Sequence, residues 1–159
     1  MRLVRRMSAT WDINPRQVGI MGFSAGGHLA STVATHSKGD AAADFQILFY
    51  PVITMEQGTT HKGSRENLLG KKPKRKLLAE YSNEQCVTKH TPRAFIALAN
   101  DDRSVSPINS ISYYEALYSE KVPASLHIYP TGGHGFGIRQ SFASHLEMMT
   151  ELRTWLRSF

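Results

Sequence analysis

One pentapeptide, Gly-Phe-Ser-Ala-Gly at residues 22–26, limits what this chain can fold into more than any other feature. The apolar residues 17–23 predict a short buried strand, and residues 25–36 predict a helix whose first turn has small side chains. A strand, a sharp turn and a helix in this order force the apex residue into a strained backbone conformation. The sequence therefore predicts that Ser24 presents its hydroxyl above a sheet as a nucleophile.

The pentapeptide is a weak signal by itself, because glycine is common and a glycine-rich turn of an ordinary doubly wound domain has the same pattern. The strand before it and the helix after it are the context that this motif requires. In that context the backbone amide of Ala25 lies at the start of the helix, where an oxyanion would form. We therefore expect Ala25 to contribute to an oxyanion hole.

Further apolar runs alternate with helical periodicities along the rest of the chain. Strands are predicted at residues 45–50, 94–99 and 125–129, and helices at residues 2–11, 64–69, 74–81, 107–121 and 141–159. In the last helix the side chains expected to face inward are Phe142, Leu146, Met149, Leu152 and Leu156. Almost continuously apolar strands that alternate with helices are typical of a parallel sheet covered on both faces. The sequence therefore predicts an α/β fold with three layers, helix, sheet and helix.

The chain has 159 residues, which suffices for one domain with its own core. We therefore treat residues 1–159 as a single domain. Residues 52–92 contain no convincing strand and two short predicted helices. We expect this segment to form a cap-like helical insertion over one end of the sheet.

The formal net charge is +6, and much of it lies in residues 2–6 and 71–76. We interpret residues 71–76 as the solvent-exposed start of a helix. A groove that binds single-stranded nucleic acid would need aromatic residues between the lysines and arginines, and this run has none. No stretch reaches transmembrane length, and no apolar run typical of a signal peptide follows the first arginines. We therefore expect no nucleic-acid or membrane partner.

The sequence does not decide the cellular compartment of the protein. The chain has one cysteine, Cys86, which excludes an intrachain disulfide and fits a reducing compartment. As the chain stands it reads as cytoplasmic, whereas a natural amino terminus further upstream would allow secretion or a periplasmic location.

Polar residues follow the predicted strands at their carboxyl ends, where ligands bind in open parallel sheets. Ser24 follows the first strand, Asp101 or Asp102 the third, and His134 the fourth, within the glycine-rich residues 131–137. A serine hydroxyl needs an imidazole to take its proton, and the imidazole needs a carboxylate to fix its tautomer. The chain order Ser, Asp, His is the order found in α/β-hydrolases. These residue types alone do not decide between the two aspartates.

The other six histidines show no spacing typical of metal ligands, so no metal and no other cofactor is predicted. His28 lies on the helix after the serine and is expected to pack or to form hydrogen bonds. His127 lies in the middle of a predicted strand and is expected to belong to the core.

Five stretches of the chain carry a family resemblance: residues 22–31, 60–70, 81–92, 101–110 and 122–137. Together they resemble the esterase and lipase branch of the α/β-hydrolases, and most closely its bacterial acetyl-xylan-type carbohydrate esterases. Residues 61–70 and 132–137 are the most specific parts of the resemblance. In that family the acid is followed by two residues and then a valine.

This spacing matches Asp102 and Val105, so the resemblance selects Asp102. It implies a serine esterase in which Ser24 attacks an ester, His134 acts as base and then acid, and Asp102 orients His134. The implied substrates are small-molecule or oligosaccharide esters, such as acetyl groups on xylan fragments. Two alternatives stay open: a serine peptidase of the prolyl-oligopeptidase type, and a catalytically impaired hydrolase fragment.

The resemblance also predicts what the chain lacks. An α/β-hydrolase has strands before its nucleophile strand and takes a second oxyanion amide from an early loop, often an HGGG-type motif. Only 23 residues precede Ser24, and the chain has no HGGG-type motif. We therefore expect the carboxyl-terminal part of the fold without its N-terminal strands, with reduced turnover. We also expect an exposed sheet edge near residues 18–23 through which the chain self-associates.

Overall fold

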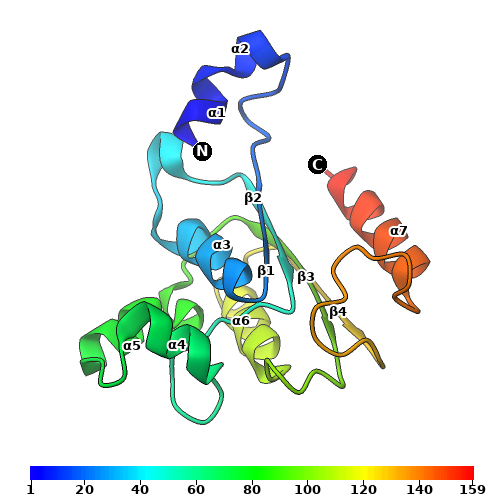
Figure 1. Ribbon diagram of the computed structural model, residues 1–159. Helices are drawn as coiled ribbons and strands as arrows, with labels where there is room; N and C mark the ends of the chain where they lie inside the picture. Colours follow the sequence, from blue (N-terminus) through cyan, green and yellow to red (C-terminus); the bar gives the residue numbers. More distant parts are fainter.

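Four apolar segments pair into one parallel sheet in the computed structural model, which describes residues 1–159 (Figure 1). The strands are β1 (Ile20–Phe23), β2 (Phe45–Phe49), β3 (Arg93–Ala99) and β4 (Ala124–Tyr129), and they lie side by side in chain order. Every neighbouring pair is parallel. The carboxyl ends of all four strands therefore meet at one edge of the sheet.

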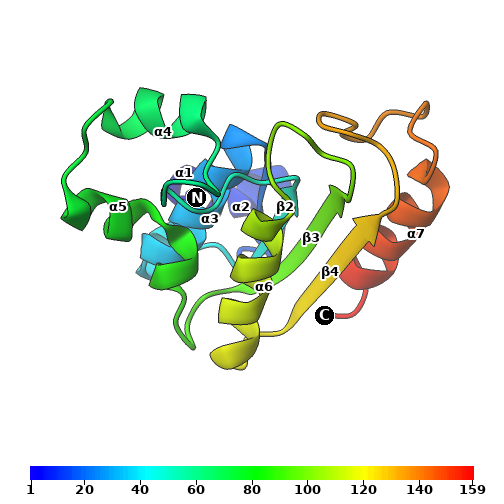
Figure 2. The same ribbon diagram turned by 90° about the horizontal axis from the view of Figure 1, so that it is seen from below.

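Helices connect the strands and cover both faces of the sheet. In chain order the helices are α1 (Arg2–Arg6), α2 (Ser8–Trp11), α3 (Ala25–His36), η1 (Gly39–Ala41), α4 (Lys62–Leu69), α5 (Arg75–Tyr81), η2 (Asn83–Cys86), α6 (Ile108–Ser119) and α7 (His145–Leu156). Of these, α1 and α2 precede β1 and bury no residue. Figure 2 shows α6 on one side of β3 and β4 and α7 on the other. The predicted three-layer α/β fold is confirmed. No helix is long and apolar enough to span a membrane.

Two clusters of buried side chains, one on each face of the sheet, explain why helices pack on both faces. On the face covered by α7, Phe49 and Phe95 pack with Met148. On the opposite face, Leu48 and Ile96 belong to the cluster that includes side chains of α3 and α6. Neighbouring residues of one strand thus point into different clusters, because successive side chains of a strand alternate between the two faces. This burial on both faces is why the strands are almost continuously apolar.

The first strand is shorter than predicted, since residues 17–19 do not join the sheet. Instead of pairing in the ladder, Val18 exchanges hydrogen bonds with Asp44. Its amide donates to the Asp44 carboxylate at 2.8 Å, and its carbonyl accepts from the Asp44 amide at 3.0 Å. The predicted helix over residues 2–11 is also divided, because Met7 leaves the helical conformation between α1 and α2.

The last helix begins four residues later than predicted, at His145 rather than at residue 141. Phe142 is buried as expected, but it lies in the turn before the helix. Leu146 was expected to face inward and is instead 77% exposed. Met148 and Leu152 pack against the sheet, and a residue two positions before Met148 points to the far side of a helix with 3.6 residues per turn.

The segment between β2 and β3 contains α4, α5 and η2 and no strand. In both views α4 and α5 lie together at one side of the sheet (Figures 1 and 2). A third buried cluster of Val52, Met55 and Val105 lies beneath this segment and receives Leu78 from α5. The segment is thereby attached to the loop after β3, close to the carboxyl ends of the strands.

Candidate active site

Ser24 occupies a strained turn between β1 and α3. Its backbone has φ 53° and ψ −121°, in a region that residues other than glycine rarely adopt. Hydrogen bonds on both sides hold it there: its amide donates to the Phe49 carbonyl at 3.0 Å, and its carbonyl accepts from the Val52 amide at 3.0 Å. The strain predicted for the apex residue is present, and the neighbouring strand β2 maintains it.

The small residues around Ser24 are required by close approach of backbone segments. A Cβ atom on Gly22 would clash with the carbonyl group of Gly26, the second residue of α3. A Cβ atom on Gly27 would come within 2.6 Å of the Pro51 ring. Gly26 differs, because a Cβ atom there would meet open space. Strand β1 and helix α3 therefore cross too closely at Gly22 for any side chain, and α3 lies too close to Pro51 for one at Gly27.

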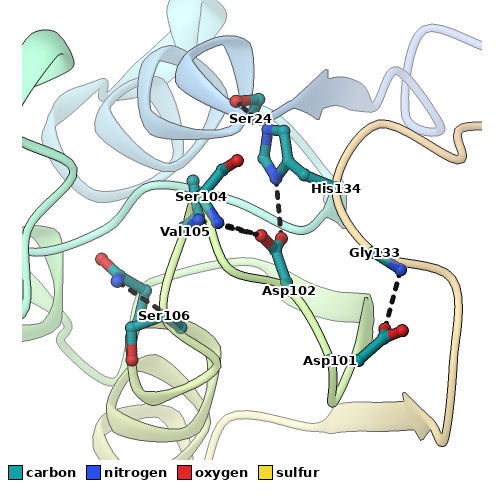
Figure 3. Close-up of polar contacts among 9 residues, drawn as sticks. Ser24, Asp101, Asp102, Ser104, Val105, Ser106, Gly133 and His134 are labelled. Carbon is teal, nitrogen blue, oxygen red and sulfur yellow. Dashed lines mark hydrogen bonds and ion pairs between the residues drawn. The ribbon is translucent and has the colours of Figure 1, made fainter.

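The predicted serine, histidine and aspartate come together at the carboxyl edge of the sheet (Figure 3). The Oγ atom of Ser24 lies 2.8 Å from Nε2 of His134, and Nδ1 of His134 lies 2.7 Å from Oδ2 of Asp102. A carboxylate accepts, so Nδ1 carries the proton and Nε2 presents its lone pair to the Ser24 hydroxyl. In this tautomer the imidazole can accept the hydroxyl proton.

The carboxylate of Asp102 is fixed by its own backbone neighbours. While Oδ2 faces His134, Oδ1 accepts the amides of Ser104 at 2.8 Å and Val105 at 2.9 Å. The side chain is only 1% exposed. A buried carboxylate needs partners for its oxygens, and here both oxygens have them. The Asp102 carboxylate thus has one orientation, which directs a single oxygen at the imidazole.

Asp101 makes a different contact, although it is the adjacent residue. Its Oδ1 accepts the backbone amide of Gly133 at 2.7 Å, and Figure 3 shows it directed away from the imidazole. The residue types alone left Asp101 and Asp102 undecided as partners of His134. In the structure Asp102 contacts the ring, and Asp101 contacts the loop that carries the ring.

Tyr50 also contacts His134, and sequence reasoning missed it. Its ring lies edge-on to the imidazole with centroids 4.8 Å apart, and it packs equally close to Phe136. Its backbone has φ 36°, an unusual value for a tyrosine. Burial raises the pKa of its phenol. The one available signal was its position at the carboxyl end of the strand predicted over residues 45–50, at the edge where the other site residues were expected.

The amide of Ala25 is the first of α3, a helix of 12 residues. It donates to no acceptor within the protein. It follows Ser24 directly, so it lies beside the hydroxyl, at the end of the helix where amides and dipole favour negative charge. A negatively charged oxygen bound next to Ser24 would satisfy this donor.

Two further histidines have structural contacts. His28 is buried as expected, and its Nε2–H donates to the Tyr81 carbonyl at 2.8 Å, which joins α3 to the end of α5. Burial lowers the pKa of His28. His127 is partly exposed rather than in the core: its ring stacks on Phe95, and Nδ1 lies 3.1 Å from Glu151. No group of three or more His, Cys, Asp or Glu side chains could hold a metal ion.

Two cavities adjoin the site. One, of about 400 Å³, lies between α3 and the segment that carries α4, and is lined by residues that include Ala25, Leu29, Asn67 and Leu68. The other, of about 320 Å³, lies beside the His134 loop. Ala25 belongs to the lining of the first cavity, which combines apolar side chains with the side-chain amide of Asn67.

The chain matches one protein-family model and is similar in sequence to two bacterial proteins. The profile of the prolyl oligopeptidase family matches residues 1–157. An acetylxylan esterase of Xylanibacter ruminicola is 47% identical over 99% of this chain and 34% of its own length. A Butyrivibrio fibrisolvens protein named endo-1,4-beta-xylanase B is 33% identical over 86% of this chain and 23% of its own length.

A crystal structure of an acetyl ester-xyloside bifunctional hydrolase from Caldicellulosiruptor lactoaceticus superposes with a TM-score of 0.93. It is 36% identical to this chain and covers 99% of it. The chain in turn covers 62% of that hydrolase and about a third of the Xylanibacter ruminicola esterase.

Proposed function

Because this chain belongs to the prolyl oligopeptidase family of α/β-hydrolases, we propose that it carries the reaction centre of a serine carboxylic ester hydrolase. The proposed substrates are carbohydrate esters with short acyl groups, acetyl above all. The observation that carries the proposal is the continuous hydrogen-bond chain from Ser24 through His134 to Asp102. The names of the similar proteins support an acetylated carbohydrate as the substrate class.

In the proposed mechanism, Ser24 Oγ attacks the ester carbonyl carbon while its proton passes to Nε2 of His134. The carbonyl oxygen becomes an oxyanion and accepts a hydrogen bond from the Ala25 amide. When the tetrahedral intermediate collapses, the C–O bond to the sugar breaks, and Nε2–H gives its proton to the leaving sugar oxygen. Asp102 holds Nδ1–H throughout and stabilises the imidazolium.

Deacylation repeats these steps with water as the nucleophile. Nε2 of His134 takes a proton from the water while the water oxygen attacks the acyl carbon. The second tetrahedral intermediate then expels Ser24 Oγ, which recovers its proton from Nε2. The products are the deacylated sugar and a carboxylic acid such as acetic acid.

We further propose that residues 52–92 act as a cap over the sugar side of the site, within a single domain of residues 1–159. The cavity of about 400 Å³ between α3 and this segment supports the proposal. It is larger than an acetyl group needs and adjoins Ala25. The cavity lining combines the aliphatic side chains of Leu29 and Leu68 with the polar side chain of Asn67. This combination suits a sugar ring, which has both apolar and hydroxyl-bearing surfaces.

A serine peptidase activity is the second candidate, and the family to which the chain belongs favours it by name. The same hydrogen-bond chain would serve an amide substrate, since the acyl transfer steps are alike. Activity on acetylated xylo-oligosaccharides and p-nitrophenyl acetate, measured beside a panel of prolyl peptides, separates the two. Hydrolysis of the peptides with no release of acetate would replace the esterase proposal.

The proposal is tested by Ser24→Ala, with Ser119→Ala as the matched control. Ser119 is an exposed serine on α6 that bonds only to the Glu115 carbonyl, outside the proposed centre. We expect Ser24→Ala to lose ester hydrolysis and labelling by a fluorophosphonate probe, while Ser119→Ala keeps both. Ester hydrolysis by Ser24→Ala at the parent rate would refute the assignment of the nucleophile.

A further inference from the structure

The residues of the loop that carries His134 do not by themselves fix the conformation of the loop. Its glycines Gly132, Gly133, Gly135 and Gly137 all have positive φ, between 54° and 154°. Glycine reaches such values without steric cost but equally reaches many others. The position of the imidazole must therefore be set by contacts between the loop and the rest of the protein.

One of those contacts is made immediately next to His134. The carboxylate of Asp101 accepts the amide of Gly133 at 2.7 Å, and Gly133 precedes His134 directly (Figure 3). The turn that carries Asp101 is itself tied to the sheet. The amide of Asn100 donates to the Tyr129 carbonyl of β4 at 2.8 Å, and the amide of Asp102 donates to the Ala99 carbonyl of β3 at 3.3 Å.

The side-chain contacts of the ring do not replace this backbone anchor. The bond from Nδ1 to Asp102 fixes one atom of the imidazole, and Tyr50 packs against the ring, but neither contact holds the backbone of the loop. The tilt of the ring, and with it the distance from Nε2 to Ser24, depends on where the Cα atom of His134 sits. That atom is one peptide unit from the amide that Asp101 holds.

We propose that Asp101 is a positioning residue for His134, whose carboxylate oxygen holds the Gly133 amide so that the imidazole reaches Ser24 and Asp102 at once. The inference rests on the proposed function and adds a second aspartate to it. The two adjacent aspartates have separate roles: Asp102 orients the ring, and Asp101 fixes the backbone from which the ring extends. What matters at position 101 is the hydrogen-bond acceptor, not the negative charge.

The test compares Asp101→Ala with Asp101→Asn, because asparagine keeps an acceptor oxygen and loses the charge. On p-nitrophenyl acetate we expect Asp101→Ala to lower kcat by roughly 10- to 100-fold, in line with the cost of misplacing a reacting group by about 1 Å. We expect KM and the melting temperature to stay near those of the parent, and Asp101→Asn to stay within a fewfold of the parent kcat.

A second readout does not depend on turnover. We expect hydrogen exchange of the amides in residues 131–137 to accelerate in Asp101→Ala and to stay at the parent rate in Asp101→Asn. Parent-like kcat and exchange in Asp101→Ala would overturn the inference, as would an Asp101→Asn variant impaired as strongly as Asp101→Ala. A parent chain without ester hydrolysis would count against the proposed function, while the exchange comparison would still decide whether Asp101 anchors the loop.

Discussion

The carboxylate of Asp102 meets Nδ1 of His134 at 2.7 Å, and its other oxygen is held by two backbone amides at 2.8 and 2.9 Å. This carboxylate cannot rotate without losing hydrogen bonds in a nearly dry environment. It therefore presents an acceptor, and only an acceptor, to the imidazole. That relationship fixes which ring nitrogen faces Ser24 with a lone pair.

Asp102→Asn should leave the fold intact and reverse the histidine tautomer. The asparagine oxygen would keep the amides of Ser104 and Val105, so its NH₂ group would face His134 and donate to Nδ1. Nε2 would then carry the proton and could no longer accept from Ser24. We expect kcat to fall by about 10⁴-fold, the magnitude typical of a triad with the wrong tautomer.

Steady-state kinetics on p-nitrophenyl acetate measure this effect, with circular dichroism as the check on folding. Asp101→Asn is the matched control, since it changes the neighbouring aspartate in the same way and should lower kcat only slightly. A larger loss of kcat in Asp101→Asn than in Asp102→Asn would transfer the orienting role to Asp101.

Gly22→Ala should destabilise the fold, because its Cβ atom would clash with the Gly26 carbonyl at the crossing of β1 and α3. Overpacking of this kind costs about 1–3 kcal/mol, and backbone atoms yield less readily than side chains. Gly26→Ala is the control, since its Cβ atom would meet open space. Urea denaturation of both variants gives the comparison. Equal free energies of unfolding would show that the crossing is looser than the structure indicates.

Acid should weaken the contact between α3 and α5 through His28. Burial lowers the pKa of His28 below its ordinary value of 6.5, so the folded state favours the neutral imidazole. The stabilisation by neutral His28 is present above pH 6.5 and is lost as the pH falls through the lowered value. His28→Gln keeps a donor for the Tyr81 carbonyl but cannot titrate, so its free energy of unfolding should decline less between pH 7 and pH 4.5.

Urea denaturation across that pH range tests the prediction. His36 lies on the same helix and its charge also disfavours protonation of His28, so His36→Gln is the companion variant. Identical pH dependence of stability in the parent and in His28→Gln would show that His28 contributes nothing to the acid sensitivity.

Self-association of the chain should depend on β1, the strand at one edge of the sheet. An edge strand presents unpaired backbone groups, and Met21 on this strand is 47% exposed. We expect the purified 159-residue chain to form dimers or larger species that Met21→Lys shifts toward monomer, because lysine on an edge strand disfavours pairing. Sedimentation velocity measures the shift. Leu146→Lys, on the exposed side of α7, is the control, and a monomeric parent chain would contradict the prediction.

The sequence by itself determined the fold class and the position of the proposed nucleophile. Both depend on short-range physics. The strands are mostly apolar because both faces of the sheet are covered, and the crossing of β1 and α3 at Gly22 admits no side chain. The order of Ser24, the aspartate pair and His134 along the chain also predicted one shared edge, since parallel strands bring their carboxyl ends together.

Only the tertiary structure decided what depends on contacts between residues far apart along the chain. Residue types could not say which of Asp101 and Asp102 faces His134, because both follow the same strand and differ only in the direction that the turn gives them. The same holds for the inward face of α7, where packing of Met148 and Leu152 on the sheet left Leu146 outside. Tyr50 contacts His134 from a backbone conformation that tyrosine rarely adopts, and its amide donates to the Ala97 carbonyl of β3 at 2.7 Å. Such long-range contacts leave no local pattern in the sequence, since each is made by residues far apart along the chain.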